Sequence, residues 1–394
     1  MRSSEPFRLP GVAPAVSLSR RRWLLGSIGA ILSLPGCGTQ AYLYPAGPDE
    51  PVHDRLRGLS DDWVLPPAQI AWRPGFGLPV EYLALPGTGS GDTPAMRREL
   101  AYPVASVGKV FLGLLVRRLV DERAVDPDAP LSAWLSPPWS ALAGDRTTWR
   151  QLARHQAGLP EPIADGAFQA AVASEPARRW TVAELAEVGL RMGRRPLVDG
   201  GFRYSNLHSV VLARAAETLA GKPLHYLALP GSDTTLSALA QDWQQPASLA
   251  WRDTGLRVWR HAREGRPIGY GRLLTDVTAY NPSWAGEGGD WSATIDGLIG
   301  LGDLLATLGR TWQDDADEWV RGAPRLGESY GWHLMRRRAW IGHTGDVPGF
   351  SCALWARPQD GAVVVAMVAL SNTRDGQQPA DALTQLVSAN LGDQ

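Results

Sequence analysis

A helical segment with a serine and a lysine at its start is the most informative part of this sequence. In residues 106–123 the apolar positions recur at helical spacing, which predicts a helix with one buried face. Ser106 and Lys109 stand three residues apart at its beginning. Residues at this spacing share a helical face, so the amine can reach the hydroxyl, and the helix N-terminus favours an alkoxide there. Ser106 is therefore a candidate nucleophile.

Lysine is rare in this chain. Of the 39 basic residues only Lys109 and Lys222 are lysines. Arginine supplies the other cations, but its pKa is too high for it to give up a proton. A lysine beside a candidate nucleophile is thus a candidate for proton transfer.

A tyrosine and an asparagine stand just before a second predicted helix, at residues 207–220. A tyrosine held against a protonated lysine has a lowered pKa, so Tyr204 is predicted to take the proton of Ser106 and return it to the leaving group. Asn206 is predicted to bind the substrate and to hydrogen-bond Lys109. Alone, a Tyr-Ser-Asn tripeptide is more often a turn.

A third motif, His343-Thr344-Gly345, stands at the end of a predicted strand. Glycine allows a backbone to approach a substrate closely, so these residues are predicted to line the substrate site. The backbone N–H groups of Ser106 and Asp346 are expected to form an oxyanion hole. Each motif alone is weak evidence for an active site, so the interpretation depends on the order and separation of all three.

The predicted elements indicate a mixed α/β domain of the α+β type. A short hairpin at residues 69–85 precedes a helical, loop-rich middle, and four close strands in residues 332–369 precede a terminal helix at 379–391. Closely spaced strands favour antiparallel pairing. We predict a hairpin, a helical region, antiparallel strands and a helix in residues 68–394, with the α/β part at about 68–123 and 295–394 and the helical part at about 124–294.

The N-terminal residues 1–37 are predicted to be an export signal. An arginine run precedes an apolar stretch at residues 23–34, which is shorter than the ~20 residues that span a bilayer. Leu34-Pro35-Gly36-Cys37 is similar to a lipoprotein processing box, which makes Cys37 a lipidation candidate; alternatively, Cys37 lies incidentally near an ordinary cleavage site. Residues 38–67 are predicted to be a tether, and Cys352 is predicted to pack in a core.

Taken together, the motifs resemble the serine β-lactamase and penicillin-binding protein superfamily, in the class C-like branch that includes DD-carboxypeptidases and carboxylesterases. The resemblance covers nearly all of the mature chain. Besides the three motifs, it rests on residues 152–160, similar to the family's "LLtHtSGLp" stretch, and on residues 291–296, similar to its "sTa-D" segment.

The resemblance implies a role for each candidate residue. Ser106 would be the nucleophile, Lys109 and Tyr204 would share the proton transfer, and Asn206 would bind substrate. His343 would occupy the place of the lysine in the Lys-Thr-Gly motif of many lactamases. The implied fold is an antiparallel sheet flanked by helices, with a helical subdomain and the substrate cleft between the two.

Two departures from the family pattern bear on the substrate. An exposed histidine titrates near ~6.5, so His343 is expected to carry a full charge only in mild acid. Asp346 adds a carboxylate on the same strand; alternatively, it points away from the cleft and caps the turn before Pro348. Both changes favour neutral esters over penicillins and other substrates with a carboxylate. The motif His155-Gln156-Ala157-Gly158 also departs from the family pattern, and we expect a structural difference there.

The sequence leaves two functions open. One is hydrolysis of an ester, a β-lactam or a cell-wall peptide through an acyl-enzyme; the other is a non-catalytic lipoprotein that binds cell-wall fragments or a protein partner. A net charge of -1 disfavours nucleic acid as a partner. The other histidines lack ligand spacing, so no metal and no cofactor are expected. We expect an exported, periplasmic protein whose membrane contact, if any, is a lipid on Cys37.

Overall fold

A computed structural model gives the fold of the chain. It describes residues 51–87, 95–123, 125–195, 197, 200–224, 243–244, 259–261, 274–277, 279–312, 319–321, 329–373 and 376–392. The predicted export signal, and Cys37 with it, lies outside these residues, so export and lipidation stay predictions. Among the described helices, none has the length and apolar character that crossing a membrane requires.

The centre of the fold is an eight-stranded antiparallel sheet in the order β2-β1-β13-β12-β11-β10-β9-β8. The N-terminal strand β1 pairs with the last strand, β13, so the two ends of the domain meet inside the sheet. This confirms the predicted antiparallel sheet. The strands are β1 (Ala68–Arg73), β2 (Glu81–Leu85), β8 (Val320–Arg321), β9 (Ser329–Gly331), β10 (Leu334–Arg337), β11 (Trp340–Val347), β12 (Phe350–Arg357) and β13 (Ala362–Val368).

The central strands are buried on both faces. Every residue of β13 is buried, and its sequence is a near-continuous run of valine and alanine with one methionine. Successive side chains of a strand point to opposite faces. Val363 and Val365 accordingly join one apolar core, and Val364 and Val368 join a second core behind the sheet.

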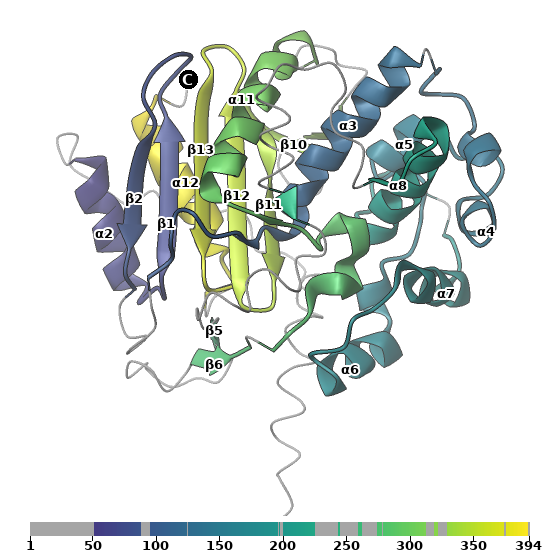
Figure 1. The fold of residues 1–394 in the computed structure, drawn as a ribbon, viewed down its shortest axis with the longest axis horizontal. Helices are drawn as coiled ribbons and strands as arrows, with labels where there is room; N and C mark the ends of the chain where they lie inside the picture. Colours follow the sequence, from purple (N-terminus) through teal and green to yellow (C-terminus); the bar gives the residue numbers. More distant parts are fainter. Residues whose placement is uncertain are drawn as a thin grey trace, which may run out of the picture.

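Helices cover both faces of the sheet and confirm the predicted flanking layers (Figure 1). Helix α11 (Ile295–Trp312) packs on β12 and β13 with side chains such as Leu298 and Leu305 in the first core. Helix α12 (Pro379–Asn390) packs on the same strands from the other side, with Leu383 in the second core.

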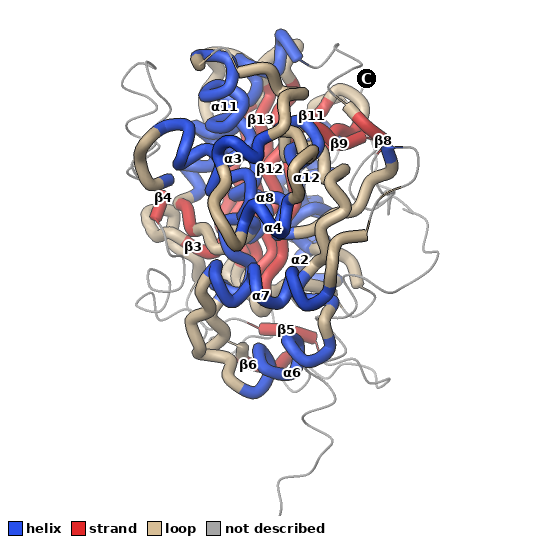
Figure 2. The backbone as a smooth tube through the Cα atoms, turned by 90° about the vertical axis from the view of Figure 1, so that its right-hand side faces the viewer, coloured by secondary structure: helices blue, strands red, loops and turns tan. Residues whose placement is uncertain are grey.

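A helical region lies beside the sheet, on the side of β11 (Figures 1 and 2). Its helix α8 contacts α3, α5 and α7. A capping box of Thr181 and Glu184 starts α7, and Gly221 in the left-handed conformation ends α8. The helices are α3 (Gly108–Glu122), α4 (Trp139–Ala143), α5 (Trp149–Ala153), α6 (Gly166–Ser174), α7 (Val182–Met192) and α8 (Asn206–Ala220).

Short elements connect these two parts. A small sheet joins β3, just before Ser106, to β7 and β4, and β5 pairs with β6. The strands are β3 (Tyr102–Pro103), β4 (Trp243–Gln244), β5 (Trp259–His261), β6 (Leu274–Asp276) and β7 (Ser292–Ala293), and the 3-10 turns are η2 (Ala105–Val107), η3 (Leu131–Trp134), η4 (Pro162–Ala164) and η8 (Pro282–Gly288).

Two sequence predictions are corrected by the fold. Part of the predicted tether, Val52–Asp62, is helix α2, which packs on α12 and β2 and buries Leu56 and Leu59. Few apolar residues mark this helix among charged neighbours, so its composition resembles a linker. The helix predicted to begin at Ser106 begins as the 3-10 turn η2 and becomes α-helical at Gly108.

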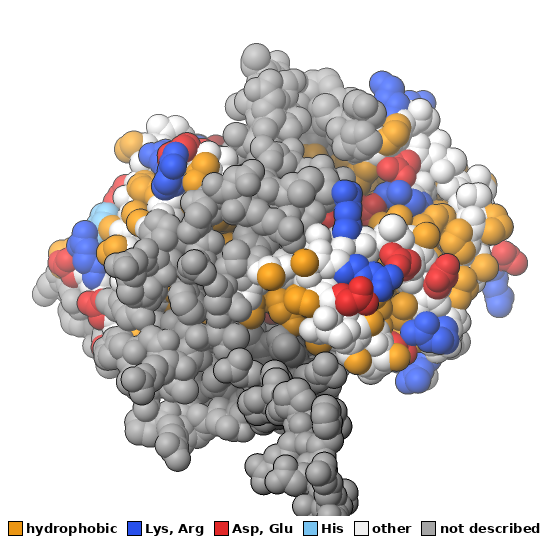
Figure 3. Space-filling view, turned by 60° about the horizontal axis from the view of Figure 1, so that its bottom comes forward, with side chains coloured by type: hydrophobic (Ala, Val, Ile, Leu, Met, Phe, Trp, Pro, Cys, Tyr) orange, Lys and Arg blue, Asp and Glu red, His pale blue; other side chains and the backbone are white. Residues whose placement is uncertain are grey.

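The charged side chains on the described surface alternate in sign. On the face drawn in Figure 3, blue and red side chains lie next to one another. Around α6 and α7, for example, Arg191 contacts Asp165 at 3.0 Å and Arg178 contacts Glu184 at 2.7 Å. The described residues on this face therefore form no broad cationic surface.

Candidate active site

The nucleophile candidate lies where β3 leads into α3. Ala105, directly before Ser106, has a φ of 49°, a left-handed conformation that is uncommon for alanine. The chain then enters η2 and α3, and Lys109 Nζ lies 3.1 Å from Ser106 Oγ. The lysine side chain is completely buried, whereas Ser106 is partly exposed. As predicted, the amine of Lys109 thus lies within hydrogen-bond distance of the Ser106 hydroxyl.

Tyr204 and Asn206 meet the same two residues from the start of α8. The Tyr204 hydroxyl donates to Ser106 Oγ at 2.9 Å. Lys109 Nζ donates to Asn206 Oδ1 at 2.7 Å and also to the carbonyl of Gly288. All four residues that the first two motifs single out therefore form one hydrogen-bonded group.

Burial sets the protonation of this group. Desolvation lowers the pKa of Lys109 to about 7, although the nearby carboxylate of Glu161 acts in the opposite direction. Desolvation raises the pKa of Tyr204, and the hydrogen bond to Ser106 offsets this only in part. The sequence-based expectation of a lowered tyrosine pKa was wrong, because burial and the nearby carboxylates of Glu161 and Asp346 raise it. The group that can be neutral and basic at neutral pH is Lys109.

Glu161 is a site residue that the sequence analysis missed. Its carboxylate accepts the backbone N–H of Asn206 at 2.6 Å and that of Ile163 at 3.3 Å, and its other contact is the Asn206 amide nitrogen at 3.4 Å. The amide of Asn206 is thereby oriented with its oxygen toward Lys109. Burial raises the pKa of Glu161 and the two backbone N–H groups lower it. In the sequence, the one indication of a role for Glu161 is that it directly follows Pro160, at the end of the "LLtHtSGLp"-like stretch.

The strand β11 brings the third motif to the nucleophile. Its pairing with β10 covers only residues 340–342, and the following residues of β11 contact η2. A Cβ atom on Gly345 would lie 2.5 Å from Ser106 N, so only glycine lets the strand come this close. Thr344, by contrast, points to the other side, where its hydroxyl contacts Met335 Sδ at 3.9 Å. The oxyanion role of the Asp346 N–H stays a prediction.

His343 does not behave as the sequence analysis expected. Its side chain is 1% exposed; Nδ1 contacts the Thr344 carbonyl and Nε2 lies 3.2 Å from the Tyr330 hydroxyl. Desolvation and the nearby Lys109 lower its pKa to about 3. The expected charge on His343 in mild acid is therefore wrong, and this position is neutral throughout the physiological range.

Asp346 is held on the other side of β11, near the start of α12. Its carboxylate accepts from Gln378 Nε2 at 2.6 Å and from Asn372 Nδ2 at 3.4 Å. Burial raises its pKa, and these two amides act against that rise. The carboxylate therefore contributes negative charge to the surroundings of the site without touching Ser106.

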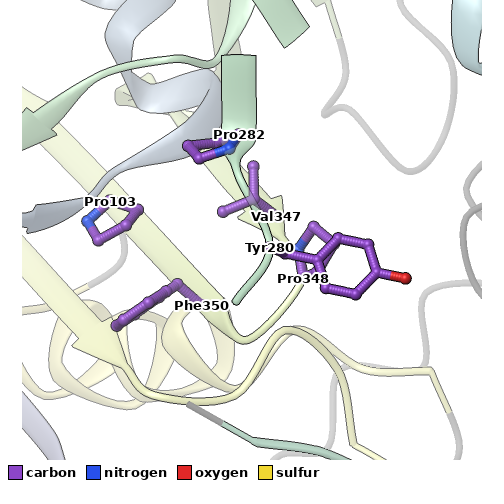
Figure 4. Close-up of a pocket in the computed structure, with 6 residues that line it drawn as sticks. All are labelled: Pro103, Tyr280, Pro282, Val347, Pro348 and Phe350. Carbon is purple, nitrogen blue, oxygen red and sulfur yellow. The ribbon is translucent and has the colours of Figure 1, made fainter. Parts of the chain in front are cut away.

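An apolar hollow lies where β11 ends (Figure 4). Val347 and Pro348 form one wall, Pro103 and Phe350 another, and Tyr280 and Pro282 complete the lining. Val347 is two residues beyond Gly345 on the same strand. Within the described residues, no His, Cys, Asp or Glu side chains form a group of three or more that could hold a metal ion.

Cys352 packs in the first core, as predicted. It is completely buried, and burial raises the pKa of its thiol. An inert cysteine of this kind contributes packing and no chemistry.

Fold and site together are those of the penicillin-binding and β-lactamase class: an antiparallel sheet, a helical region, and Ser106, Lys109 and Tyr204 at their junction. Residues 79–389 match the family model described as Beta-lactamase. The chain therefore belongs to the beta-lactamase family, which confirms the resemblance seen in the sequence.

Several solved structures share the fold. A D-stereospecific amidohydrolase from Streptomyces sp. is 20% identical, with a TM-score of 0.67 over 87% of this chain and 98% of that one. A D-amino acid amidase from Ochrobactrum anthropi SV3 is 19% identical, with a TM-score of 0.67 over 86% and 99%. A penicillin binding protein from Bacillus halodurans is 16% identical, with a TM-score of 0.60 over 85% and 99%. At such identities the likeness concerns the fold.

Proposed function

We propose that this protein is a serine hydrolase that cleaves an ester or amide through an acyl-enzyme on Ser106. The observation that carries the proposal is the placement of Ser106 Oγ between Lys109 Nζ, at 3.1 Å, and the Tyr204 hydroxyl, at 2.9 Å. A neutral amine has two N–H groups and one lone pair. Asn206 and Gly288 accept the two N–H groups, which leaves the lone pair for the proton of Ser106.

The first half of the reaction forms the acyl-enzyme. Lys109 takes the hydroxyl proton as Ser106 Oγ bonds to the substrate carbonyl carbon, and the oxyanion lies at the N–H groups of Ser106 and Asp346. The bond to the leaving group then breaks. Tyr204 donates its proton to that group and is reprotonated from Lys109. In the second half, water attacks the ester on Ser106 with the same groups acting in reverse.

The charges around the site favour substrates without a carboxylate next to the scissile bond. His343 is neutral, and the acidic groups Glu161 and Asp346 both act electrostatically on Tyr204. Two of the solved structures with this fold are a D-amino acid amidase and a D-stereospecific amidohydrolase. Their names support the proposal that amides, as well as esters, are substrates. We therefore propose neutral esters and amino-acid amides ahead of penicillins.

A substrate panel tests this preference. We expect kcat/KM for a p-nitrophenyl ester or a D-amino acid amide to exceed that for nitrocefin or a D-Ala-D-Ala peptide. His343→Lys introduces a cation, and Asp346→Asn removes a charge while keeping an oxygen that accepts from Gln378 Nε2. Each is expected to raise the nitrocefin-to-ester ratio about fivefold, since a charge effect of about 1 kcal/mol corresponds to that factor. An unchanged ratio in both variants contradicts the charge argument.

The pH profile tests the role of Lys109. Because the neutral amine is the active form, kcat/KM should rise with pH through about 7 and level off above it. Glu161 raises the pKa of Lys109, so Glu161→Gln should move the midpoint to lower pH while its amide oxygen still accepts the Asn206 N–H. The other titratable neighbours, His155, His208, His333 and His343, are buried with lowered pKa values and stay neutral in this range.

His343→Gln is the matched control for the pH experiment. It removes a buried titratable group whose pKa lies near 3, so the midpoint should stay at its parental value. If the midpoint of the pH profile shifts in His343→Gln, or does not shift in Glu161→Gln, Lys109 is not the group that titrates.

A further inference from the structure

A buried cluster of histidine rings lies behind the catalytic tyrosine. His155 is at its centre, with ring centroids at 4.7 Å from His208, 4.9 Å from His333 and 4.9 Å from Tyr330. All three histidines are completely buried. The reaction as proposed above uses none of them.

His155 makes two contacts with the segment that carries the catalytic tyrosine. Its ring is parallel to that of Tyr204, with an angle of 2° between the planes and 4.6 Å between the centroids. Its Nδ1 accepts the backbone N–H of Ser205 at 3.0 Å. One side chain thus holds both the ring of Tyr204 and the backbone that follows it.

The backbone of His155 is itself specialised for this position. Its φ of 55° is in the left-handed region, which is uncommon outside glycine. His155 lies just after α5. Its carbonyl accepts the N–H of Arg203 at 2.9 Å, which ties its backbone to the residues just before α8. Asparagine and glycine tolerate this φ, which makes them suitable test substitutions.

The ring is also neutral, as its contacts require. Because Nδ1 accepts a hydrogen bond, the single proton of the neutral ring is on Nε2. Burial, with the neighbouring histidines and Lys109, lowers the pKa of His155 well below its usual value. A neutral ring can stack on Tyr204 without placing a second cation near Lys109, whose Nζ lies 4.9 Å from the centroid of the Tyr204 ring.

We propose that His155 is a positioning residue for Tyr204: its stacked ring fixes the phenol so that the hydroxyl meets Ser106. The inference rests on the proposed function, in which Tyr204 relays the proton to the leaving group. The hydroxyl is 2.9 Å from Ser106 Oγ, and a ring free to tilt would lose this distance. Misplacement of a reacting group by about 1 Å can cost about a hundredfold in rate.

The test compares variants that separate the ring from the hydrogen bond. His155→Asn removes the stacked ring but leaves an oxygen that can accept the Ser205 N–H. His155→Phe keeps a ring and loses the acceptor. With a p-nitrophenyl ester, kcat should fall about tenfold or more in His155→Asn, with KM changing less than about threefold, because the phenol is misplaced in the reacting complex. His155→Phe should keep kcat within about threefold of the parent despite a lower Tm.

His333→Asn is the matched control. His333 has the same burial and a φ of 63°, and it contacts the His155 ring. Its substitution should lower Tm by a similar amount while kcat stays within about threefold of the parent. If His155→Asn does not fold, His155→Gly, which also suits the left-handed backbone, replaces it. Equal losses of kcat in His155→Asn and His333→Asn, or an unaltered kcat in a folded ring-less variant, overturn the proposal.

The outcome also separates this inference from the proposed function. A parent protein that neither turns over esters nor labels with a fluorophosphonate contradicts the hydrolase itself. A parent that is active, with His155 variants that match the control, contradicts only the positioning role.

Discussion

Ser106→Ala is expected to abolish turnover and covalent labelling while the protein keeps its fold. Without the hydroxyl no acyl-enzyme forms, and the loss of a nucleophile costs on the order of 10⁴-fold or more in kcat. The fold should survive because neither η2 nor α3 has a side-chain cap, so the Ser106 hydroxyl stabilises no helix end. Its removal leaves Lys109 Nζ and the Tyr204 hydroxyl with one hydrogen-bond partner fewer, a loss of about 1–3 kcal/mol.

Labelling with a fluorescent penicillin or a fluorophosphonate, followed by mass spectrometry of the modified peptide, measures this directly. Ser209→Ala is a suitable control, because Ser209 is a completely buried serine on α8 whose hydroxyl has no hydrogen-bond partner in the described part of the chain. It should label like the parent. Labelling of Ser106→Ala at the parental rate would falsify the assignment of the nucleophile. Absence of labelling in the parent would favour the non-catalytic alternative.

Lys109→Arg is expected to lose nearly as much activity as Lys109→Ala, about 10²- to 10⁴-fold in kcat/KM. A guanidinium cannot become the neutral base at accessible pH, whereas burial brings the amine of Lys109 to a pKa of about 7. The pocket also fits a single nitrogen rather than a guanidinium, because three hydrogen-bond partners converge on Lys109 Nζ.

The chain provides its own control for this substitution. Lys222, the other lysine, is exposed just after α8, so Lys222→Arg should leave kcat/KM unchanged. Circular dichroism and Tm establish that each variant is folded before rates are compared. Near-parental rates in Lys109→Arg would show that only a positive charge is needed and that another group accepts the proton.

The sequence predicted best what depends on local pattern. The periodicities of residues 362–369 and 379–391 correspond to β13 and α12, and the antiparallel sheet followed from the short spacing of the last strands. Helix α2 was missed because its stability comes from packing on α12 and β2, which local composition does not reveal.

The sequence predicted which residues form the site, but it did not predict the burial and the pKa values of their side chains. Ser106, Lys109, Tyr204 and Asn206 meet as their spacing and the family resemblance implied. The lowered pKa expected for Tyr204 and the ordinary pKa expected for His343 were wrong, because both depend on desolvation, which arises only when distant segments close around them. Glu161 was missed for the same reason, since its contacts with Asn206 span 45 residues of chain.

The pairing of β1 with β13 has a consequence for biosynthesis. Chains emerge from the ribosome N-terminal end first, so Ser106 is made long before Gly345 and before the strand that must lie beside β1. Until β11, β12 and β13 have been added, the nascent chain carries its nucleophile without the strand edge that faces it. The surroundings of the nucleophile therefore depend on strands that only the C-terminal part of the chain supplies.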